Sequence, residues 1–368
     1  MLERPKPYAV KLEWREWIRG LLRAALTLGL ALLAAYLVIR LSSTQPGEAF
    51  GTLMLGPLGG RRTLGNWLDD ATKLTLAGLA FSVIFQARQF SLGTQGQVYL
   101  GGLAAGVVAL SPLGPGGWAI ALGLGAAALV GAAYGALPGV LKARLGANEI
   151  VSSLMLNYIA IDVFTYLLRA IIAPRGSGLT TSAPFPAAAV YPALIANSRI
   201  DLGLVFALIA TFTVWFALYR TRWGFELRMT GFNPKFAEHS GIDTPHRTIS
   251  AFAVSGVLGG VLGAALVQGQ SFGQLAVGFE SALSFEGLLV AIVARNHPLA
   301  VPLVALIYGY FRQGAVLMGF RTDVPVEVIG IVQGLVIVLV SSRGLFSGLT
   351  FSRRPRATFA YKEGDPGE

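Results

Sequence analysis

The segment Asn148-Glu-Ile-Val-Ser-Ser-Leu-Met-Leu-Asn-Tyr-Ile-Ala160 opens a hydrophobic stretch that runs to Ala173. It carries carboxylate, amide and hydroxyl groups into a helix long enough to cross a lipid bilayer. Polar side chains in hydrocarbon are energetically expensive, so their presence in a span indicates a function. The segment therefore predicts a membrane-spanning helix whose side chains can meet a polar solute.

The composition of the whole chain favours one integral membrane domain. Of the 368 residues, 54% are hydrophobic and 13% are charged, and the mean hydropathy is +0.62. Soluble domains contain about 25% charged residues, so two or three soluble domains of this total length are not expected. The chain has no cysteine, which excludes disulfides, thiolate nucleophiles, iron–sulfur clusters and Cys-ligated zinc.

The net charge of +10 is compatible with binding to nucleic acid or to anionic lipid, and its distribution favours lipid. Basic residues gather before the first hydrophobic span, in the central loop between Arg220 and Arg247, and in the tail after Arg343. Clusters of Lys and Arg beside hydrophobic spans follow the positive-inside rule. We interpret the charge as a topology signal rather than a nucleic-acid surface.

Hydropathy predicts an all-α fold, a polytopic transmembrane helix bundle of about 8–10 spans with broken helices and both termini in the cytoplasm. The expected spans are 20–41, 67–87, 90–110, 118–140, 150–173, 202–220, 248–268, a short piece at 284–294, 298–319 and 326–342. Residues 1–19 form a cytoplasmic or interfacial segment, 20–342 the transmembrane domain with a cytoplasmic loop at 221–247, and 343–368 a basic cytoplasmic tail. Residues 42–66, 111–117 and 174–199 are expected as long external connections, of which the last is either a docking surface or an inert connector. Repeated small residues, such as Gly131/Gly135/Gly139 and Gly256/Gly260, predict close helix packing.

Motifs of catalysis are missing from the sequence. There is no G-x-x-x-x-G-K-[ST] loop and no G-x-S-x-G elbow, and His239, His246 and His297 lack metal-ligand spacing. We therefore expect a transport protein rather than an enzyme, with no cofactor and no metal bound by this chain.

The stretch Gly93-Thr-Gln-Gly-Gln97 predicts a break in a helix at membrane depth. Irregular backbone at that depth persists only where it faces protein or a wet cavity. We favour a lined cavity, in which Gln95 and Gln97 contact a neutral, hydroxyl-rich solute, over a simple loop at the membrane face.

In the span from residue 150, Tyr158, Asp162, Tyr166 and Arg169 are spaced along one helical face. A carboxylate facing lipid costs about 2.5–3.5 kcal/mol, so Asp162 is expected to face the bundle interior or a pore. For Asp162 we favour a buried pair with Arg169, or a hydrogen bond between helices, over a role in transport. For Asn157, beside this face, we favour contact with the solute together with Tyr158.

A second interrupted segment follows in the last third of the chain. Glu286 precedes Gly287 at the head of a short apolar piece, and Asn296 is expected to cap a helix that begins at Pro298. Gln95-Gly96 and Glu286-Gly287 occupy comparable places in the two halves. Such short, glycine-interrupted segments point to a central pathway, which would include Glu286 and Asn296.

The central loop contains Gly231-Phe-Asn-Pro-Lys-Phe-Ala-Glu-His-Ser-Gly241. Proline near the start and glycine at the end predict a short helix lying flat on the cytoplasmic side. The alternatives are a contact for a cytoplasmic ATPase and a plain amphipathic loop.

Taken together, the 148–160 segment, Gln95-Gly96-Gln97, Gly231-Phe-Asn-Pro with Gly241, Phe285-Glu-Gly-Leu with Asn296-His-Pro298, and Val324-Pro-Val-Glu-Val-Ile-Gly-Ile-Val-Gln-Gly334 resemble ABC-importer permeases of the branched-chain amino acid/simple sugar superfamily. The nucleoside-uptake permeases within it are the most similar group. The matches run in order from about residue 67 to 342.

The resemblance implies a permease subunit in a prokaryotic plasma (inner) membrane, forming half of a nucleoside path. Its partners would be a second homologous permease subunit, two ABC ATPase subunits or one double ATPase that bind ATP and magnesium, and an extracytoplasmic substrate-binding protein. The implied coupling-loop residues are Gly231, Asn233, Ala237, Glu238 and Gly241.

The sequence departs from the family pattern at two places. Gln95 stands where an acid is usual, and Phe236, His239 and Ser240 replace small residues or Tyr in the loop motif. These departures leave the substrate open, so a simple-sugar ABC permease is the alternative. An ion-coupled secondary transporter is a less favoured alternative, supported by Asp162 and Glu286.

Overall fold

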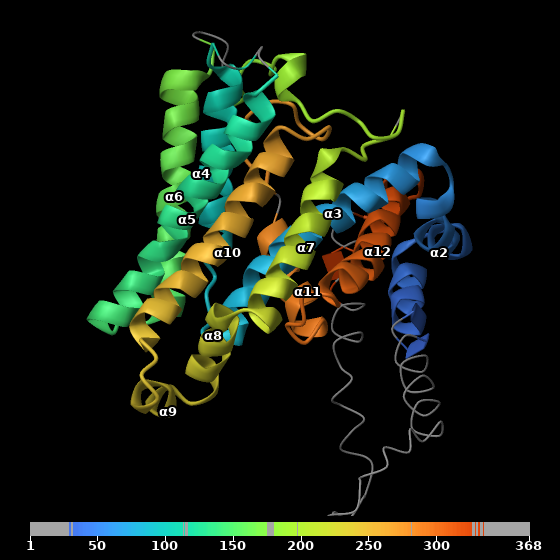
Figure 1. Cartoon of the computed structure of the whole chain (residues 1–368). Coiled ribbons are helices and arrows are strands. Elements are labelled where there is room, and N and C mark those ends of the chain that lie inside the picture. Colours follow the sequence, from blue (N-terminus) through green and yellow to red (C-terminus); the bar gives the residue numbers. More distant parts are fainter. Residues whose placement is uncertain are drawn as a thin grey trace, which may run out of the picture.

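The structure, a computed structural model, describes residues 29–325 except 31, 113, 115, 116, 175–179, 197 and 281, together with 328, 330, 331 and 334. This part of the chain is mainly helical, and its β-structure consists of two isolated bridges, Thr181 with Ala276 and Ala193 with Asp201. Figure 1 shows one elongated bundle of tilted helices. The predicted all-α polytopic bundle is confirmed.

The helices follow one another with short connections. The first described helix, Leu32–Ser42, is followed by α2 (Pro46–Leu55), the 3₁₀ turn η1 (Gly56–Leu58), α3 (Arg61–Gln86), α4 (Thr94–Leu110), α5 (Ala119–Leu145) and α6 (Glu149–Leu167), which continues as a π-helical turn, η2 (Leu168–Ile172). After the 3₁₀ turn η3 (Ala187–Ala189) come α7 (Leu202–Arg220), α8 (Arg222–Phe232), α9 (Pro234–His239), α10 (Thr244–Val267), α11 (Leu283–Val293) and α12 (Val301–Arg321).

Five helices in the described part are long and apolar enough to cross a membrane, namely α5, α6 with η2, α7, α10 and α12. Helix α3 has 26 residues, but it carries charged side chains, and α4 and α11 have 17 and 11 residues. Seven of the eight segments expected between residues 67 and 319 begin within four residues of a helix, and the first of them, expected at 67, begins earlier, at Arg61. Most of the predicted span 326–342 and the segments 1–19 and 343–368 lie outside the described residues.

The segment 42–66, predicted as a long external connection, contains the helix α2. Pro46 and Glu48 in the first turn favour the start of a helix, and α2 buries Ala49 and Leu53 on its inner side. Leu53 packs closely on α12, since a Cβ atom on Gly314 would lie 2.2 Å from the Leu53 carbonyl oxygen. The hydropathy pattern missed this helix because it is short and lies between glycines and prolines.

Helix α10 is the centre of the bundle and packs most extensively on α5 and α4 (Figure 1). Its backbone touches that of α5, since a Cβ atom on Gly256 would lie 2.1 Å from the Gly131 carbonyl oxygen. A Cβ atom on Gly260 would lie 2.0 Å from the carbonyl oxygen of Ala127. The close packing predicted from these glycines is confirmed, and no larger side chain fits between the two helices.

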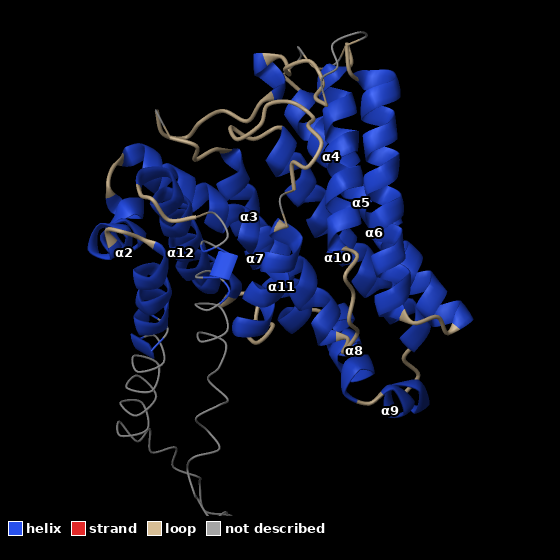
Figure 2. Ribbon diagram, turned by 180° about the vertical axis from the view of Figure 1, so that it is seen from behind, coloured by secondary structure: helices blue, strands red, loops and turns tan. Residues whose placement is uncertain are grey.

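The two ends of the bundle differ, as Figure 2 shows: α8 and α9 lie at one end, and the long loops lie at the other. At the loop end, residues 180–201 run beside residues 268–282. Ser182 N donates to Leu275 O, Phe185 N to Gly273 O, and Tyr191 N to Gln268 O, at 2.7–2.8 Å. Asp201 accepts from Gly203 N at 2.8 Å and from Gln270 N at 2.9 Å, and its burial raises the pKa of its carboxyl group.

The contact between α5 and α10 predicts a strong effect of added volume at Gly256. We expect Gly256→Val to lower the free energy of unfolding by at least about 2–3 kcal/mol, because backbone on both sides leaves no room to relax. Gly125→Ala on α5 is the control, since a Cβ atom there meets nothing within 4 Å. Thermal unfolding of the two purified variants in detergent measures the difference. Equal melting temperatures would contradict the packing.

Candidate functional site

The broken start of α4 is fastened to α6 by two polar side chains. Asn157 Oδ1 accepts from Gly96 N at 2.8 Å, and Asn157 Nδ2 donates to Leu92 O at 2.5 Å. Ser153 Oγ accepts from Leu92 N at 3.0 Å. The predicted break does not lie within residues 94–97, which are helical. The irregular backbone is the connection that ends at Gly93, and α6 supplies hydrogen bonds to it and to the first turn of α4.

Asn157 and Gln97, both predicted to line a path, lie inside the packed bundle. Each is about 1% exposed. The Gln97 carboxamide lies between α5 and α10, where a Cβ atom on Gly259 would be 2.7 Å from its Oε1. Neither polar atom of that carboxamide has a hydrogen-bond partner in the described structure. A solute would reach these two groups only after α4 separates from its neighbours, and their role in a path remains a prediction.

Gln95 contacts a carboxylate that the sequence reasoning missed. Gln95 Nε2 donates to Glu280 Oε2 at 3.0 Å, and the side chain of Glu280 is almost completely buried. Glu280 also accepts from Ala282 N at 3.1 Å and from Ser284 N at 2.6 Å, so it caps α11. The amino-terminal ends of α4 and α11 thus meet at one carboxylate. Its position just before an apolar helix is a capping signal that the sequence does contain.

Three aromatic rings pack together beside this meeting point. Tyr99 lies 5.1 Å from Phe164 and 4.9 Å from Phe279, measured between ring centroids, and Phe164 lies 5.4 Å from Phe279. They come from α4, α6 and the extended segment before α11. All three rings are buried, so the cluster fills the space between these elements.

The charged side chains of the inner helices form two networks. Arg312 on α12 forms ion pairs with Asp70 at 2.8 Å and with Glu286 at 3.0 Å. The contact with Glu286 Oε2 does not have the geometry of a hydrogen bond. Lys73 contacts Asp69 at 2.5 Å and Ser271 Oγ at 2.6 Å. Glu286, predicted for the path, is therefore part of a contact between α3, α11 and α12.

Asn296 does not cap the following helix, so that prediction is wrong. The next helix, α12, begins at Val301 and has Ala300 at its cap position. Arg295 and Asn296 have φ of 52° and 57°, and Asn296 N donates to Ala291 O at 2.9 Å. Asn296 thus ends α11 in the left-handed conformation, which asparagine tolerates. Its carbonyl oxygen accepts from Gln86 Nε2 at 2.9 Å.

The expected pair of Asp162 with Arg169 is also wrong. Both side chains are exposed, and within the described residues no ion pair joins them. Seven residues of helix separate them by about 10 Å along the axis, too far for contact. Tyr158, also predicted for the path, is 58% exposed on the same helix.

The predicted short helix in the central loop is present as α9. Asn233 Oδ1 accepts from Phe236 N at 3.1 Å and caps it, and Gly241 follows it with φ of 79°. Ala237 is fully buried, and Glu238 accepts from Thr244 Oγ1 at 2.7 Å. The loop residues named from the sequence therefore build one compact turn.

The base of this turn is fixed to the bundle, whereas its tip is free. A Cβ atom on Gly231 would lie 2.4 Å from the Gln86 carbonyl oxygen, so α8 touches the end of α3. Glu226 on α8 pairs with Arg247 at 2.6 Å and with Arg222 at 2.8 Å. Phe236 on α9 is 55% exposed, and Phe232, at the end of α8, is 73% exposed although Arg88 Cζ lies 5.4 Å from its ring centroid. Two exposed aromatic rings on a rigid base form a surface suited to a protein partner.

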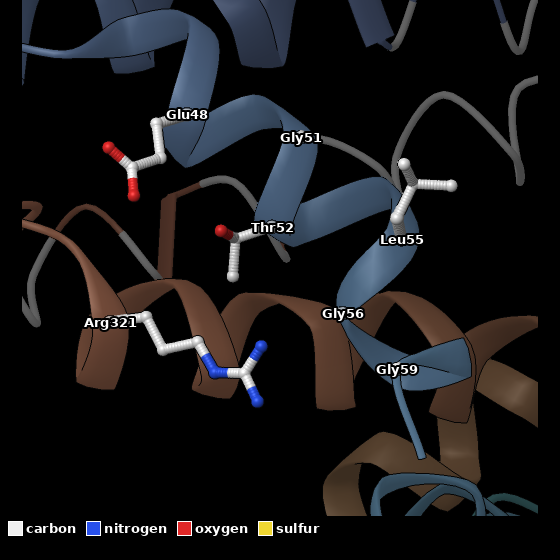
Figure 3. Close-up of a pocket in the computed structure, with 7 residues that line it drawn as sticks. All are labelled: Glu48, Gly51, Thr52, Leu55, Gly56, Gly59 and Arg321. Carbon is white, nitrogen blue, oxygen red and sulfur yellow. The ribbon is translucent and has the colours of Figure 1, made fainter.

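A hollow of about 340 Å³ lies away from all of these residues, between α2 and the end of α12. Figure 3 shows Glu48, Thr52 and Arg321 around it, together with glycines of α2 and η1. The hollow contains none of the residues that the sequence singled out, and it is open to the surface. We do not connect this hollow with transport.

Comparison with known proteins identifies the class of this bundle as an ABC transporter permease. A family model described as "Branched-chain amino acid transport system / permease component" matches residues 63–341. The chain belongs to this family.

Several curated relatives are similar over most of their length. The guanosine ABC transporter permease protein NupP of Bacillus subtilis is 30% identical over 321 residues, covering 86% of this chain and 91% of that protein. The nucleoside ABC transporter permease protein NupB of Lactococcus lactis is 28% identical, covering 81% and 84%. A glucose ABC transporter permease of Haloferax volcanii is also 28% identical, covering 85% and 86%.

The network around Arg312 predicts a large cost when the cation alone is removed. Arg312→Met leaves Asp70 and Glu286 without their partner, and we expect a loss of about 3–5 kcal/mol in the free energy of unfolding. Adding Asp70→Asn and Glu286→Gln to that variant should recover much of the loss. Arg321→Met, at the exposed end of the same helix, is the matched control. Unfolding curves that do not separate these variants would contradict the network.

The contacts of Asn157 predict a structural effect that is separable from a role in the path. Asn157→Leu leaves the Gly96 N–H and the Leu92 carbonyl unpaired, and we expect a loss of about 2 kcal/mol or more. Ile159→Val, at an exposed neighbouring position, should change stability by less than about 0.5 kcal/mol. A shift in solute preference without any loss of stability would favour the path role instead.

Proposed function

We propose that this chain is a permease subunit of an ATP-driven importer and forms half of the translocation path for a nucleoside. The observation that carries the proposal is the turn formed by α8 and α9. It is anchored to α3 and α10, and it presents Phe232 and Phe236 at the end of a bundle that belongs to an ABC permease family. A permease that binds no nucleotide needs such a rigid contact to receive the motion of an ATPase.

The nucleoside assignment is supported by the names of the relatives. Two of them are named for guanosine or nucleoside transport, and each is covered over more than four fifths of its length. A relative named for glucose transport keeps the simple-sugar permease as the second candidate. Both solute classes are neutral and rich in hydroxyl groups, so they call for the same amide, carboxylate and aromatic groups.

The proposal includes partners and a location. A second homologous permease subunit completes the path, and two ABC ATPase subunits or one double ATPase bind ATP and magnesium. An extracytoplasmic substrate-binding protein delivers the solute to the loop end of the bundle. The complex lies in the plasma (inner) membrane of a prokaryote, with the α8–α9 end and both termini in the cytoplasm.

Under this proposal, the motion of the ATPase reaches the contact between α4 and α11. Among the described side chains, one hydrogen bond, from Gln95 to Glu280, joins the amino-terminal ends of these two helices. The α8–α9 turn contacts the end of α3, and α3 packs on α11. Motion of the turn thus has a continuous route through packed helices to α4, which packs on α6.

An ion-coupled transporter is less well supported. In the sequence, this alternative rested on two acids, Glu286 and Asp162. Glu286 pairs with Arg312, and Asp162 lies on the outer face of α6. Neither arrangement makes a buried carboxylate site for an ion.

The coupling role of the turn leads to a prediction at Gly241 and Phe236. Gly241→Val strains a residue with φ of 79°, and Phe236→Ala removes an exposed ring; each should cut ATP-driven uptake by at least about tenfold. Solute binding by the external protein should stay unchanged in both variants. Phe236→Ala should also leave the stability unchanged, whereas the strain in Gly241→Val should lower it. Phe320→Ala, an exposed ring at the far end of α12, is the control. Unimpaired uptake and ATPase stimulation in both variants would refute the coupling assignment.

Reconstitution of the complete complex distinguishes the two solute classes. Uptake into liposomes should require ATP and should be inhibited by an excess of unlabelled nucleoside but not of glucose. Inhibition by glucose alone would replace the nucleoside with a sugar. Uptake driven by an ion gradient without ATP would overturn the importer itself.

A further inference from the structure

The outer face of α6 carries polar groups that no other part of the described chain covers. Tyr158 is 58% exposed and Tyr166 is 67% exposed, and Asp162 lies exposed between them at a spacing of four residues. No hydrogen bond or ion pair within the described residues reaches the Asp162 carboxylate. All three lie within the candidate span Glu149–Ile172.

Helix α7 shows what a lipid-facing surface looks like in the same protein. Its exposed large side chains include Leu208, Ile209, Phe212 and Phe216, all of which are apolar. Helix α6 lies at an outer edge of the bundle in both views (Figures 1 and 2). The Tyr158–Asp162–Tyr166 face is therefore on the surface of the bundle, where a carboxylate that faces lipid costs about 2.5–3.5 kcal/mol.

Two other ways of covering this face are disfavoured. Arg169 lies about 10 Å along the axis from Asp162, and no other described basic residue forms an ion pair with it. A dry contact with a second copy of α6 would bring Asp162 near the same carboxylate of the other copy, because two-fold symmetry about the membrane normal keeps equivalent residues at equal depth. Like charges in a dry contact repel strongly. Water and a solute remain the occupants that suit a lone carboxylate between two tyrosines.

We propose that the Tyr158–Asp162–Tyr166 face is a wet wall of the translocation path and that Asp162 is a specificity-determining residue. Its charge repels anions, so neutral nucleosides pass while their phosphorylated forms are rejected. The tyrosine rings offer stacking surfaces to a base, and the carboxylate accepts hydrogen bonds from sugar hydroxyls. The identity of the solute rests on the proposed function, whereas the wetness and the charge of the face do not.

The native chain has no cysteine, so single-cysteine variants of it report on one position each. In the assembled complex, Tyr158→Cys and Tyr166→Cys are treated with membrane-impermeant thiosulfonates of opposite charge, and rates are normalised to those of a free thiol. Ile209→Cys and Phe212→Cys on α7 are the matched controls. We expect both α6 positions to react at least tenfold faster than the α7 positions.

The effect of the Asp162 charge is measured as the ratio of the labelling rates with the cationic and the anionic reagent. The cationic reagent should be favoured over the anionic reagent by about tenfold at the α6 positions. Adding Asp162→Asn should remove most of that preference, whereas Asp162→Glu should keep it. A merely structural role for Asp162 would lower both rates together and leave their ratio unchanged.

Two results would overturn the proposal. Thiols on α6 that react no faster than those on α7 would show a face covered by lipid or protein. A charge preference that survives Asp162→Asn would remove Asp162 as its source. If instead the labelling behaves as expected but the complex takes up no nucleoside, the wet, anion-excluding wall stands and the nucleoside assignment fails. Uptake of a nucleoside monophosphate by the Asp162→Asn complex, at least tenfold above that of the unaltered complex, completes the test.

Discussion

The fold depends on satisfying backbone groups where helices are broken inside an apolar bundle. Each unpaired N–H or C=O group there costs several kcal/mol, so a side chain must supply the missing partner. Asn157 supplies this at the start of α4, and Glu280 supplies it at the start of α11. Because Gln95 joins the two breaks, the same few polar groups hold the bundle together and close its centre.

Close helix contact makes this polar arrangement possible. Glycines on α5 and α10 let their backbones touch, and the Gln97 carboxamide occupies the space that side chains at Gly135 and Gly259 would fill. Small residues thus do more than shorten the distance between helices. They create the volume in which amides sit inside the bundle, and a movement of α4 would expose those amides as a group.

Much of the architecture was predictable from sequence because hydropathy and glycine spacing are local signals. The helix α9 followed from Pro234 and Gly241 in the same way, and the structure adds its cap at Asn233. What failed needed three-dimensional information. Asn296 ends a helix rather than starting one, and Asp162 is exposed rather than paired, because each outcome depends on neighbours that are distant in sequence. The role of Glu280 was not predictable from its position alone, because its contact with Gln95 joins residues 185 positions apart.

The charges of the chain divide into two kinds, and that division separates structure from transport. Asp69, Asp70 and Glu286 are paired with Lys73 or Arg312, and they fasten α3 to α11, α12 and the segment before α11. A paired acid in a membrane is compatible with a purely structural role. Asp162 has no such partner among the described residues, and its helix otherwise exposes mainly apolar side chains. An exposed acid that no described side chain pairs needs a polar environment, and the water of a translocation path is the environment that we propose for it.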